Sequence, residues 1–570
     1  FTNDLATWAV QHQISHIALR ALLQRLKQYS CFSTLPIDAR SILKTPRQQD
    51  IRIVPPGTYH HFGVSNSVLK ILSSVKESID CIKITINIDG LPLTKSSQQQ
   101  FWPILGSIVS YNNVFMIGVY HGNEKPADVN DFLKYFVDEM KDLCENGINI
   151  QGRNIPCRLE ALICDTPAKA FVLCVKGHSG YSSCTKCQTE GQNVQNRICF
   201  PQVDAPLRTD EDFIRKIDDD YHKLEYHILN LSNVPLDYMH LICLGIMRKL
   251  IYLWVEGDLH YRLRATAVEA ISICLVVKLK PSIPVEFARK PRKIECVKMW
   301  KATEYRLILL YTGPLDFKSV LKKDVYTHFM ILHVIIRILS SENLKEYINY
   351  AQDLILYFIK KFIQLYGIQN VSHNVHNLMH LVEDVKKFGP LDNFSAFKFE
   401  NYMQTLKKYI RKADRPLQQV IRRHEEGLNL SSVSSTISSN SDTLMSLHYD
   451  GPLTLNCKNP QYKMIKYNGI VFEAGSLADS CCGLNDGTIV SIANIAYCTK
   501  RTIPVIIGYE LLRQDNLFNV PCPSSLLGIY IVHLCSNLKS WPLQSIVKKY
   551  IKLLYEENRY AVFPLIHTQT

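Results

Sequence analysis

Residues 161–187 read ALICDTPAKAFVLCVKGHSGYSSCTKC, and this stretch decides how the rest of the chain is interpreted. Asp165 follows the apolar run ALIC, which is typical of a buried strand, and Pro167 disfavours any further strand pairing. Cys184 and Cys187 have the spacing of one half of a zinc site. A carboxylate at a strand end, followed closely by a pair of metal-ligand cysteines, indicates metal-dependent chemistry. Each feature therefore needs partners elsewhere in the chain.

The bulk composition is that of a multidomain globular protein. A chain of 570 residues is too long for one hydrophobic core, so we expect roughly two to four domains. Hydrophobic residues make up 46% and charged residues 21%, which is ordinary for a folded protein. The net charge of +13 favours an acidic partner, of which nucleic acid is the commonest.

Cysteine usage and hydropathy indicate an intracellular protein without a membrane span. The 18 cysteines are scattered, unlike those of a small secreted domain, and no signal peptide is visible. Arg337 interrupts FMILHVIIRIL, and no run reaches the ~20 apolar residues that a membrane span requires. In a reducing compartment a Cys-x-x-Cys pair is expected to hold metal. Because the chain begins with Phe1 rather than Met, we also expect residues upstream of it.

The beginning of the chain is predicted to be an N-terminal helical region, residues 1–78. The run LATWAVQHQISHIALRALLQRL at 5–26 carries apolar residues at helical spacing, and Pro55-Pro56-Gly57 is predicted to be a linker. A helix-turn-helix and a small helical packing module both fit this pattern, and we favour the packing module.

From Cys81 the pattern changes to that of strands. Isoleucines at 82, 84, 86 and 88 alternate with polar residues, and this strand ends on Asp89-Gly90. The next predicted elements are strands FWPILGSIV and VFMIGVY, a helix over 128–146, and a strand RLEALIC that leads to Asp165.

Three strands, a helix and a fourth strand are typical of the start of an RNase H-like fold. The first and fourth strands are neighbours in that fold, so Asp89 and Asp165 would lie side by side. We assign residues 79–187 to the first part of this core. The alternative is that each aspartate caps a turn, which most aspartates at strand ends do. With two acids at matching strand ends, both interpretations remain open.

The remainder of the chain is predicted to alternate between helical and β-rich regions. Amphipathic runs suggest an inserted helical domain, and SSVSSTISSNSD suggests a flexible linker. NDGTIVSIANI and TIPVIIGYEL are typical of strands in a small β-rich domain, which we expect to have a helical end. The predicted regions are a helical insertion at 188–390, the last core helix at 391–428, a Ser-rich linker at 429–445, and a C-terminal β-rich domain at 446–570.

Two histidines are the best candidates to complete the zinc half-site. His376 and His380 are four residues apart, so on a helix they face the same way. With Cys184 and Cys187 they form a Cys2His2 set, which is tetrahedral and closed, and so structural. Such an ion would join the two ends of the helical insertion. His373 is the main rival ligand.

If the insertion is closed in this way, the next acid along the chain is Glu400. Asp89, Asp165 and Glu400 would then form a cluster of three carboxylates, which is costly without cations because like charges raise each other's pKa. Two Mg²⁺ ions, or two Mn²⁺ ions, would offset that cost and support phosphoryl transfer. The alternative for Glu400 is a solvated residue on a helix face.

Two basic segments could deliver a nucleic-acid backbone to these acids. The first follows Glu400 and includes Tyr402, Tyr409, Arg422 and Arg423. The second is RKPRK at 289–293, followed by WKATEYR. Such charge runs are more often solvated faces, but their position beside the predicted acids favours binding. The predicted DNA-binding residues are Arg289, Lys290, Arg292, Lys293, Lys301, Lys407, Lys408, Arg411, Lys412 and Arg415.

Six segments between about residue 80 and residue 426 carry a resemblance to a known family. They are IDG at 88–90, the Cys-x-x-Cys pair after Asp165, LDYMHLICLGIMRKL at 236–250, ARKPRKIECVKMWKATEYRLILLYTGP at 288–314, VHNLMHLVEDVKKFGP at 375–390 and FENYMQTLKKYIRKADRP at 399–416. In this order and spacing they resemble the CACTA-type transposases of the CMC group, which are more distantly related to the catalytic subunit of the V(D)J recombinase.

The resemblance implies a nuclear DDE transposase on an RNase H-like core, with a helical insertion and a zinc knuckle. It implies that Asp89, Asp165 and Glu400 are the catalytic acids, with Glu304 as the competitor of Glu400. Asp237 and His240 are interpreted as a structural start to the insertion. The implied partners are double-stranded DNA, both transposon ends and target, and at least one further copy of the chain. The rivals are a domesticated, non-catalytic DNA- or chromatin-binding protein and a nuclease without strand transfer.

Overall fold

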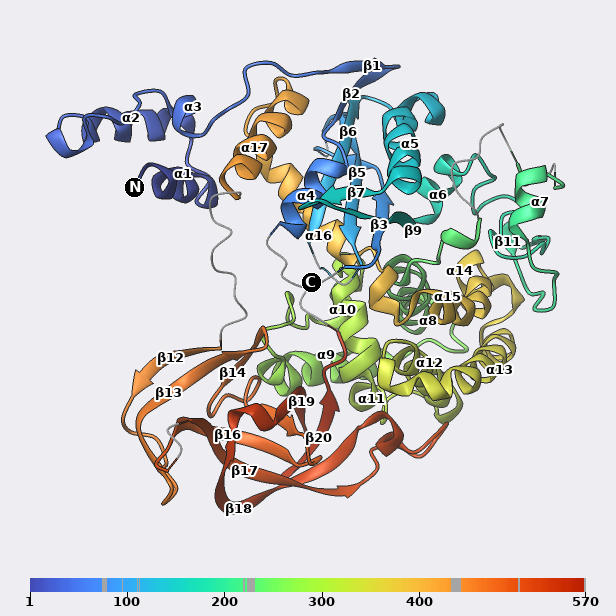
Figure 1. Cartoon of the computed structure of the whole chain (residues 1–570). Helices are drawn as coiled ribbons and strands as arrows, with labels where there is room; N and C mark the ends of the chain where they lie inside the picture. The colour runs from blue at the N-terminus through green and yellow to red at the C-terminus, as the bar shows by residue number, and fades with distance from the viewer. Residues whose placement is uncertain are drawn as a thin grey trace. The chain divides into compact units, whose positions relative to one another are not determined.

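The protein consists of two compact units, each assembled from separate stretches of the chain (Figure 1). The first unit comprises Phe1–Gly177, Thr209–Pro235 and Ala396–Ser439, and the second comprises His178–Arg208, Leu236–Ser395 and Asn440–Thr570. The computed structural model describes residues 1–73, 79–94, 96–109, 111, 113–218, 221–222, 231–431, 442–500 and 503–567.

The first unit is a mixed sheet with helices. Its helices are α1 (Thr2–Gln11), α2 (His16–Leu26), α3 (Ala39–Ile42), α4 (Ser65–Leu72), α5 (Val129–Asn146), α6 (Thr166–Val172), α7 (Asp210–Arg215), α16 (Phe397–Tyr409) and α17 (Pro416–Ser431). Its strands are β1 (Arg52–Val54), β2 (Gly57–His61), β3 (Ile82–Ile88), β4 (Leu91–Pro92), β5 (Gln100–Ile108), β6 (Val114–Gly122), β7 (Ile148–Ile150), β8 (Arg153–Ile155) and β9 (Cys157–Ile163).

The main sheet of the first unit confirms the predicted strand neighbours. Its order is β1-β2-β6-β5-β3-β9, and all of these pairs are antiparallel except β3 with β9, which is parallel. Asn87 of β3 lies opposite Ile163 of β9. The strands predicted from the alternating pattern and the helix predicted over 128–146 all form, as β3, β5, β6, β9 and α5.

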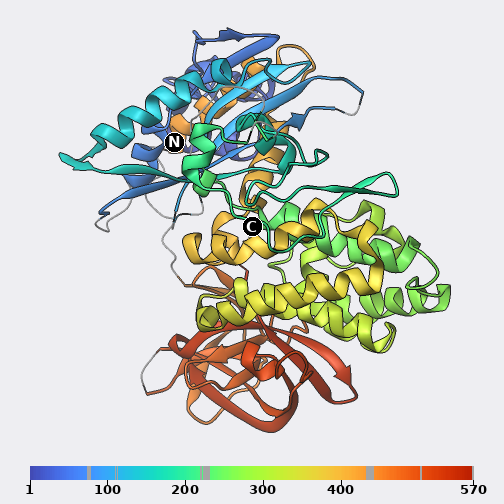
Figure 2. The same cartoon turned by 90° about the vertical axis from the view of Figure 1, so that its right-hand side faces the viewer.

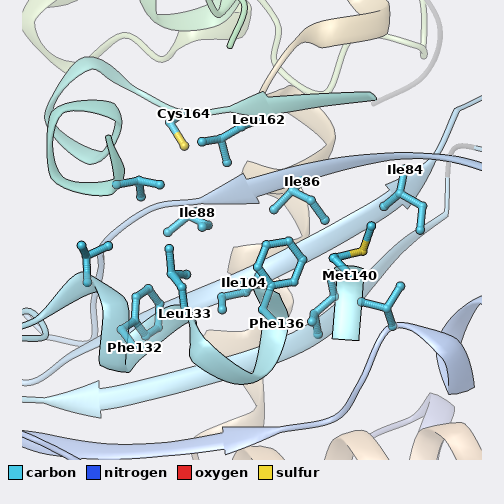
Figure 3. Close-up of a cluster of buried hydrophobic side chains, with 14 of the residues drawn as sticks. Ile84, Ile86, Ile88, Ile104, Phe132, Leu133, Phe136, Met140, Leu162 and Cys164 are labelled. Carbon is cyan, nitrogen blue, oxygen red and sulfur yellow. The ribbon is translucent and has the colours of Figure 1, made fainter. Parts of the chain in front are cut away.

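One face of this sheet packs against α5. The alternation of β3 places Ile84, Ile86 and Ile88 on the same face, where they join a continuous buried cluster. Figure 3 shows Phe132 and Phe136 of α5 pointing into that cluster. Apolar residues spaced by three and four positions on α5 therefore meet apolar residues spaced by two on β3. Burial of a Phe or Ile side chain contributes about 1.5–3 kcal/mol, so this contact is a main source of stability for the unit.

The opposite face carries polar residues of the same strands and is covered by α16. Thr85 donates a hydrogen bond to the carbonyl of Ser107, and Asn87 donates to the carbonyl of Ile163 at 2.8 Å. Lys398 of α16 donates to the hydroxyl of Ser107 at 3.1 Å. Burial lowers the pKa of Lys398 to about 8. Both α16 and α17 also contact β6, so the segment from residue 397 to residue 431 packs against the sheet.

The N-terminal region differs from the prediction in one respect. Helices α1 to α3 form and share a small apolar core of their own. The predicted linker at residues 55–57, however, belongs to a hairpin in which Val54 of β1 pairs with Gly57 of β2. Strand β2 extends the main sheet, with the fully buried Tyr59 opposite Tyr120 of β6. Residues 52–61 therefore belong to the sheet. Their structure is decided by pairing with the edge of strand β6 and not by local periodicity.

The second unit joins a large helical region to a β-rich region. Its helices are η3 (Met239–Met247), α8 (Arg248–Glu256), α9 (Ala265–Ile273), η4 (Cys274–Leu279), η5 (Lys280–Ser282), η6 (Ile294–Met299), α10 (Ala302–Leu307), η7 (Ile308–Thr312), α11 (Gly313–Asp316), α12 (Lys323–Leu339), η8 (Glu342–Tyr347), α13 (Ile348–Tyr366), η9 (Ile368–Asn370), α14 (His373–Asn377), η10 (Leu378–His380), α15 (Leu381–Phe388), η11 (Leu391–Phe394), η12 (Ser524–Leu527) and η13 (Leu543–Ser545). Its strands are β10 (Gln192–Val194), β11 (Arg197–Cys199), β12 (Thr443–His448), β13 (Cys457–Tyr467), β14 (Ile470–Glu473), β15 (Cys481–Leu484), β16 (Ile489–Cys498), β17 (Pro504–Asp515), β18 (Tyr530–Pro542), β19 (Ile546–Glu556) and β20 (Arg559–Pro564).

The C-terminal strands form one antiparallel sheet that closes on itself. The order is β12-β13-β16-β15-β19-β20-β18-β17, and β16 also pairs with β17. The helical end expected for this domain is wrong, since its last elements are β19 and β20. Tyr550, Ile551 and Leu553 of β19 are buried between paired neighbours. The predicted Ser-rich linker falls largely on residues 432–441, which lie outside the described residues.

The helical and β-rich regions of the second unit lie against each other (Figure 2). They share buried polar contacts. Arg337 of α12 is fully buried and donates to the carbonyls of Leu310 and Pro564 at 2.9 and 3.0 Å. Helix α12 is apolar on most of its surface because it is surrounded by protein. Across the described part of the chain, no helix has both the length and the apolar character needed to cross a bilayer.

Candidate metal centres

Four side chains of the second unit form a compact buried cluster. Cys184, Cys187, His376 and His380 each offer one ligand atom, and these atoms lie within 4.8 Å of one another. The sequence predicted this set, and the structure brings all four residues together. Two pairs that are nearly 200 positions apart in the chain therefore meet.

The distances within the cluster match the edges of a zinc tetrahedron. With Zn–S near 2.3 Å and Zn–N near 2.05 Å, tetrahedral angles require about 3.8 Å between two sulfurs and about 3.6 Å between sulfur and nitrogen. The two sulfurs are 3.6 Å apart. Cys187 Sγ lies 3.3 Å from His376 Nε2, and Cys184 Sγ lies 3.7 Å from His380 Nε2. The arrangement therefore fits an ion at its centre, with no ligand position left open.

The cysteines are positioned by a tight loop held against residues 206–208. The amide of Lys186 donates to Cys184 Sγ at 3.4 Å, which favours a thiolate at that position. Arg208 donates from its amide to the carbonyl of Lys186 at 2.9 Å and from Nε to the carbonyl of Cys184 at 3.0 Å. The loop is thus fixed from both sides before any ion binds.

The histidines lie where α14 tightens into the 3₁₀ turn η10. Their ring centroids are 5.4 Å apart. The rival ligand His373 is not in the cluster, because its Nε2 lies 3.2 Å from the carbonyl of Ser183 and its Nδ1 lies 3.0 Å from the side-chain amide of Asn377. His373 therefore connects the histidine helix to the cysteine loop and does not act as a ligand.

The two thiols titrate differently. Burial raises the pKa of Cys184, but hydrogen bonds from Cys187, His376 and His380 outweigh it and hold that pKa well below the ordinary value. The hydrogen bond to Cys184, together with burial, raises the pKa of Cys187. The two opposite shifts have one cause, the contact between the two sulfurs, which are 3.6 Å apart. The cluster can hold a structural zinc ion.

One residue that supports the cluster was not predicted. Asp384, on α15, accepts a hydrogen bond from the ammonium group of Lys186 at 2.6 Å and from the amide of Leu236 at 2.8 Å. It therefore ties the cysteine loop to the start of the helical region. The available signal was its spacing, since an acid four positions after His380 lies on the same helix face.

Two carboxylates of the first unit also lie together, at one edge of the main sheet. Asp89 follows β3, Asp165 follows β9, and each has a carboxylate oxygen within 4.8 Å of the other. The parallel register explains this approach, because Asn87 and Ile163, two residues before each aspartate, are paired. The two side chains are therefore neighbours at the ends of paired strands, as the strand order predicted.

Both aspartates also stabilise the local backbone. Asp165 is the N-cap of α6, and its Oδ1 accepts from the amide of Ala168 at 2.7 Å. Asp89 Oδ1 accepts from the amide of Gly90 at 2.7 Å. The two interpretations left open by the sequence are therefore compatible, since both aspartates form local hydrogen bonds and also lie close to each other.

The third predicted acid, Glu400, is not part of this pair. It is half-buried on α16, and within the described residues it belongs to no group of ligand atoms that all lie within 4.8 Å of one another. The role predicted for Glu400 thus stays a prediction.

The other acids considered from the sequence have structural roles in the second unit. Glu304 is 3% exposed, and both of its oxygens accept from the Arg292 guanidinium at 2.6 Å. One of them also accepts from the amide of Lys301 at 2.8 Å, so Glu304 caps α10. Asp237 accepts from the amide of His240 at 2.9 Å and from its ring at 2.6 Å. These contacts lie at the start of the helical region, and the structural role expected for Asp237 and His240 stays a prediction.

The predicted DNA-binding residues divide into engaged and exposed side chains. Arg292 is committed to Glu304, and Lys290 donates to the carbonyl of Ile283. Lys407 is half-buried. The exposed members are Arg289, Lys290, Lys293 and Lys301 in the second unit and Lys408, Arg411, Lys412 and Arg415 in the first, and of these Lys290 and Arg411 also donate to backbone carbonyls.

The C-terminal part of the chain matches a known protein family. Residues 447–565 match a family described as a domain of unknown function, DUF8592. The matched segment is about a fifth of the chain and comprises the C-terminal sheet almost entirely. Among curated proteins, none is similar to this chain.

Proposed function

We propose that this chain is a DDE-type DNA transposase that cleaves and joins DNA strands in the nucleus. The observation that carries the proposal is the approach of Asp89 and Asp165 to within 4.8 Å at the ends of two parallel neighbouring strands. Ligands of α/β sheets bind at the carboxyl ends of such strands. The resemblance of residues 80–426 to CACTA-type transposases supports the same assignment.

The topology supports an RNase H-like core for this enzyme. Along the chain, β3 pairs antiparallel with β5 and β5 with β6, and the fourth strand, β9, pairs parallel with β3. The order of these strands in the sheet is β6-β5-β3-β9. Helix α5 covers one face and α16 covers the other. Helix α16, which carries Glu400, therefore returns to the sheet after the whole helical region.

Two Mg²⁺ ions, or two Mn²⁺ ions, fit the proposed reaction. Asp89 and Asp165 would hold them, with Glu400 as the third carboxylate. When bound, such ions lower the pKa of a nucleophilic water or 3′-hydroxyl and stabilise the leaving oxygen. Each aspartate accepts a hydrogen bond from a backbone amide, which restricts the motion of its side chain. Neither step needs a covalent enzyme intermediate.

The surroundings of the acids fit a DNA substrate. The net charge of +13 and the exposed side chains of Lys408, Arg411 and Lys412 favour a polyanion. A zinc ion in the Cys2His2 cluster would keep the helical region closed while DNA is bound. Joining two transposon ends requires two active sites, so we expect at least a dimer.

The test is a strand-cleavage and joining assay with terminal-repeat DNA and Mg²⁺ or Mn²⁺. Asp89→Asn, Asp165→Asn and Glu400→Gln are compared with wild type, and Glu304→Gln is the control acid. We expect the two Asn variants to lose at least 100-fold in cleavage rate while still binding DNA. The proposal would be contradicted if only Glu304→Gln lost cleavage activity while Asp89→Asn kept full activity.

A second candidate is a domesticated DNA- or chromatin-binding protein on the same fold. It is favoured by the capping role of Asp165 and by the position of Glu400 outside the carboxylate pair. DNA binding without cleavage by the wild-type protein would support this candidate. Cleavage without strand joining would instead identify a nuclease.

A further inference from the structure

A cavity of about 410 Å³ lies in the first unit, at the N-terminal end of α2 and the beginning of α17. It is lined by five cationic side chains, those of Arg411, Lys412, Arg415, Arg422 and Arg423. Its volume is in the range of small-ligand sites. The cavity brings together residues some 400 positions apart in the chain, so neither segment alone forms it.

The cations of this pocket are not neutralised by its two acids. Glu426 is 3% exposed and is already bonded to His16 Nε2 at 3.0 Å and to the hydroxyl of Thr45. Asp414 is 86% exposed, and its closest cation in the pocket is Arg415, at 3.9 Å. Within the part of the chain that the structure describes, Arg422 and Arg423 have no ion-pair partner. The pocket therefore carries a net positive charge.

Arg423 is the member of this set that most needs an anion. Its Nε is buried and has no hydrogen-bond partner among the described residues. Burial and the neighbouring Arg411 lower the pKa of Arg423. A guanidinium group that has no carboxylate partner favours an anion close to its charge.

The backbone around the pocket is held in place without a ligand. Gln419 accepts from the amides of Arg411 and Lys412 at 3.0 and 3.2 Å, and it donates to the carbonyls of Lys412 and Asp414 at 2.8 and 2.6 Å. Arg411 also donates to the carbonyl of Gln13, just before α2. The cationic loop is therefore pre-organised against α2, which reduces the entropy lost on binding.

Helix α2 adds backbone donors to this wall of the pocket. Its first intrahelical hydrogen bond runs from Leu19 to Ser15, and the Ser15 hydroxyl accepts from the amide of Ala18. The amides of His16 and Ile17 precede that bond and have no acceptor within the helix. They lie at the positive end of the helix dipole, which favours a negative charge beside them.

We propose that this pocket binds phosphate groups of a nucleic-acid backbone. Guanidinium groups and first-turn amides form the hydrogen bonds that phosphate oxygens accept. Backbone rather than base recognition is favoured because the only ring among the lining residues is His16, which is held by Glu426. The phosphate chemistry follows from the pocket itself, whereas DNA as its source rests on the proposed function.

The test separates the phosphate chemistry from its source. The variant Arg422→Gln/Arg423→Gln is compared with wild type and with the charge-matched control Lys134→Gln/Lys141→Gln, which alters two exposed lysines of α5 in the same unit. Binding of inorganic pyrophosphate is measured by calorimetry. Binding of a duplex oligonucleotide is measured across a salt series. Melting curves establish that each variant is folded, and Lys412→Gln/Arg415→Gln replaces the arginine pair if that variant unfolds.

We expect the pocket variant to lose at least tenfold in affinity for pyrophosphate. For DNA, the slope of log K against log salt should fall by about 1.8, since each phosphate contact contributes about 0.9. The control should retain the wild-type values in both assays.

Three outcomes bear on the proposal. Equal pyrophosphate affinity in wild type and pocket variant would overturn it. Loss of pyrophosphate binding with an unchanged DNA slope would overturn the nucleic-acid source and identify a site for small phosphorylated ligands. A reduced DNA slope in a protein that never cleaves DNA would support this inference while refuting the transposase proposal.

Discussion

Removal of zinc from the Cys2His2 cluster is expected to destabilise the second unit by a measurable amount. The substitution is Cys187→Ser, which removes the sulfur that lies 3.3 Å from His376 Nε2 and 3.6 Å from its partner sulfur. A serine hydroxyl does not ionise near neutral pH and is a poor zinc ligand. The closed ligand set would then be reduced to three residues.

The magnitude follows from the geometry of the cluster and the size of the unit. Structural sites of this type bind zinc with about 10–16 kcal/mol, and 12.3 kcal/mol within that range corresponds to a Kd of about 1 nM. At about 1 µM free zinc, binding then stabilises the folded state by about 4 kcal/mol. The second unit has about 320 residues, so its unfolding entropy converts this into a shift of about 6 °C in Tm.

The assay combines zinc content with thermal unfolding. Wild type should carry one zinc per chain and lose about 6 °C in Tm when EDTA is added, whereas Cys187→Ser should carry none and be insensitive to EDTA. Cys199→Ser is the matched control, because Cys199 is buried in the same unit but is not a ligand. Wild-type protein that takes up no zinc at 1 µM, or whose Tm ignores EDTA, would refute the reasoning.

Three further predictions concern buried charges and a helix cap. Burial raises the pKa of Asp316 to about 7, so this carboxyl group stays protonated in the folded state, and the protein loses stability as pH rises from about 4 to 7. The variant Asp316→Asn should therefore be more stable than wild type by up to roughly 4 kcal/mol. In denaturant titrations this difference should level off above pH 7. In such titrations the free energy of unfolding of Asp165→Asn should stay within about 0.5 kcal/mol of wild type, because asparagine also caps helices, whereas Asp165→Ala should lose about 1 kcal/mol. Equal losses in the two variants would contradict the capping role. Lys549 has no exposed surface and bonds two buried carboxylates at 2.6 and 2.7 Å, so Lys549→Met should lower the free energy of unfolding by about 3–5 kcal/mol, and a loss under 1 kcal/mol would show that the site repacks.

Local sequence patterns predicted the elements that bear the acids and the zinc ligands. The alternation before Asp89 and the apolar run before Asp165 each identify a strand, because period-two burial is a property of the strand itself. Proline at 167 marked the end of β9 for a similarly local reason. The pairing of β3 with β9 followed from strand order, and the structure confirms it.

Where a sequence pattern fits two structures, contacts with residues distant in the sequence decide which one forms. Apolar residues at 546, 550 and 553 suit a helix as well as a strand, and pairing with β15 and β20 makes this segment a strand. Residues 55–57 suit a linker, and an available edge at β6 makes them part of a hairpin. The difference between the helix and strand propensities of these residues is smaller than the free energy of burying their side chains, so tertiary contacts decide which structure forms.

The sequence by itself determined which residue types were available for chemistry: two acids at strand ends, a Cys-x-x-Cys pair with histidines four apart, and an excess of cations. Only the tertiary structure decided which of them meet. It joined His376 and His380, but not His373, to the cysteines; it committed Glu304 to Arg292; and it assembled a cationic pocket from α2 and α17. The reason is physical, since periodicity reports interactions within a few residues, whereas coordination and charge compensation depend on groups hundreds of residues apart.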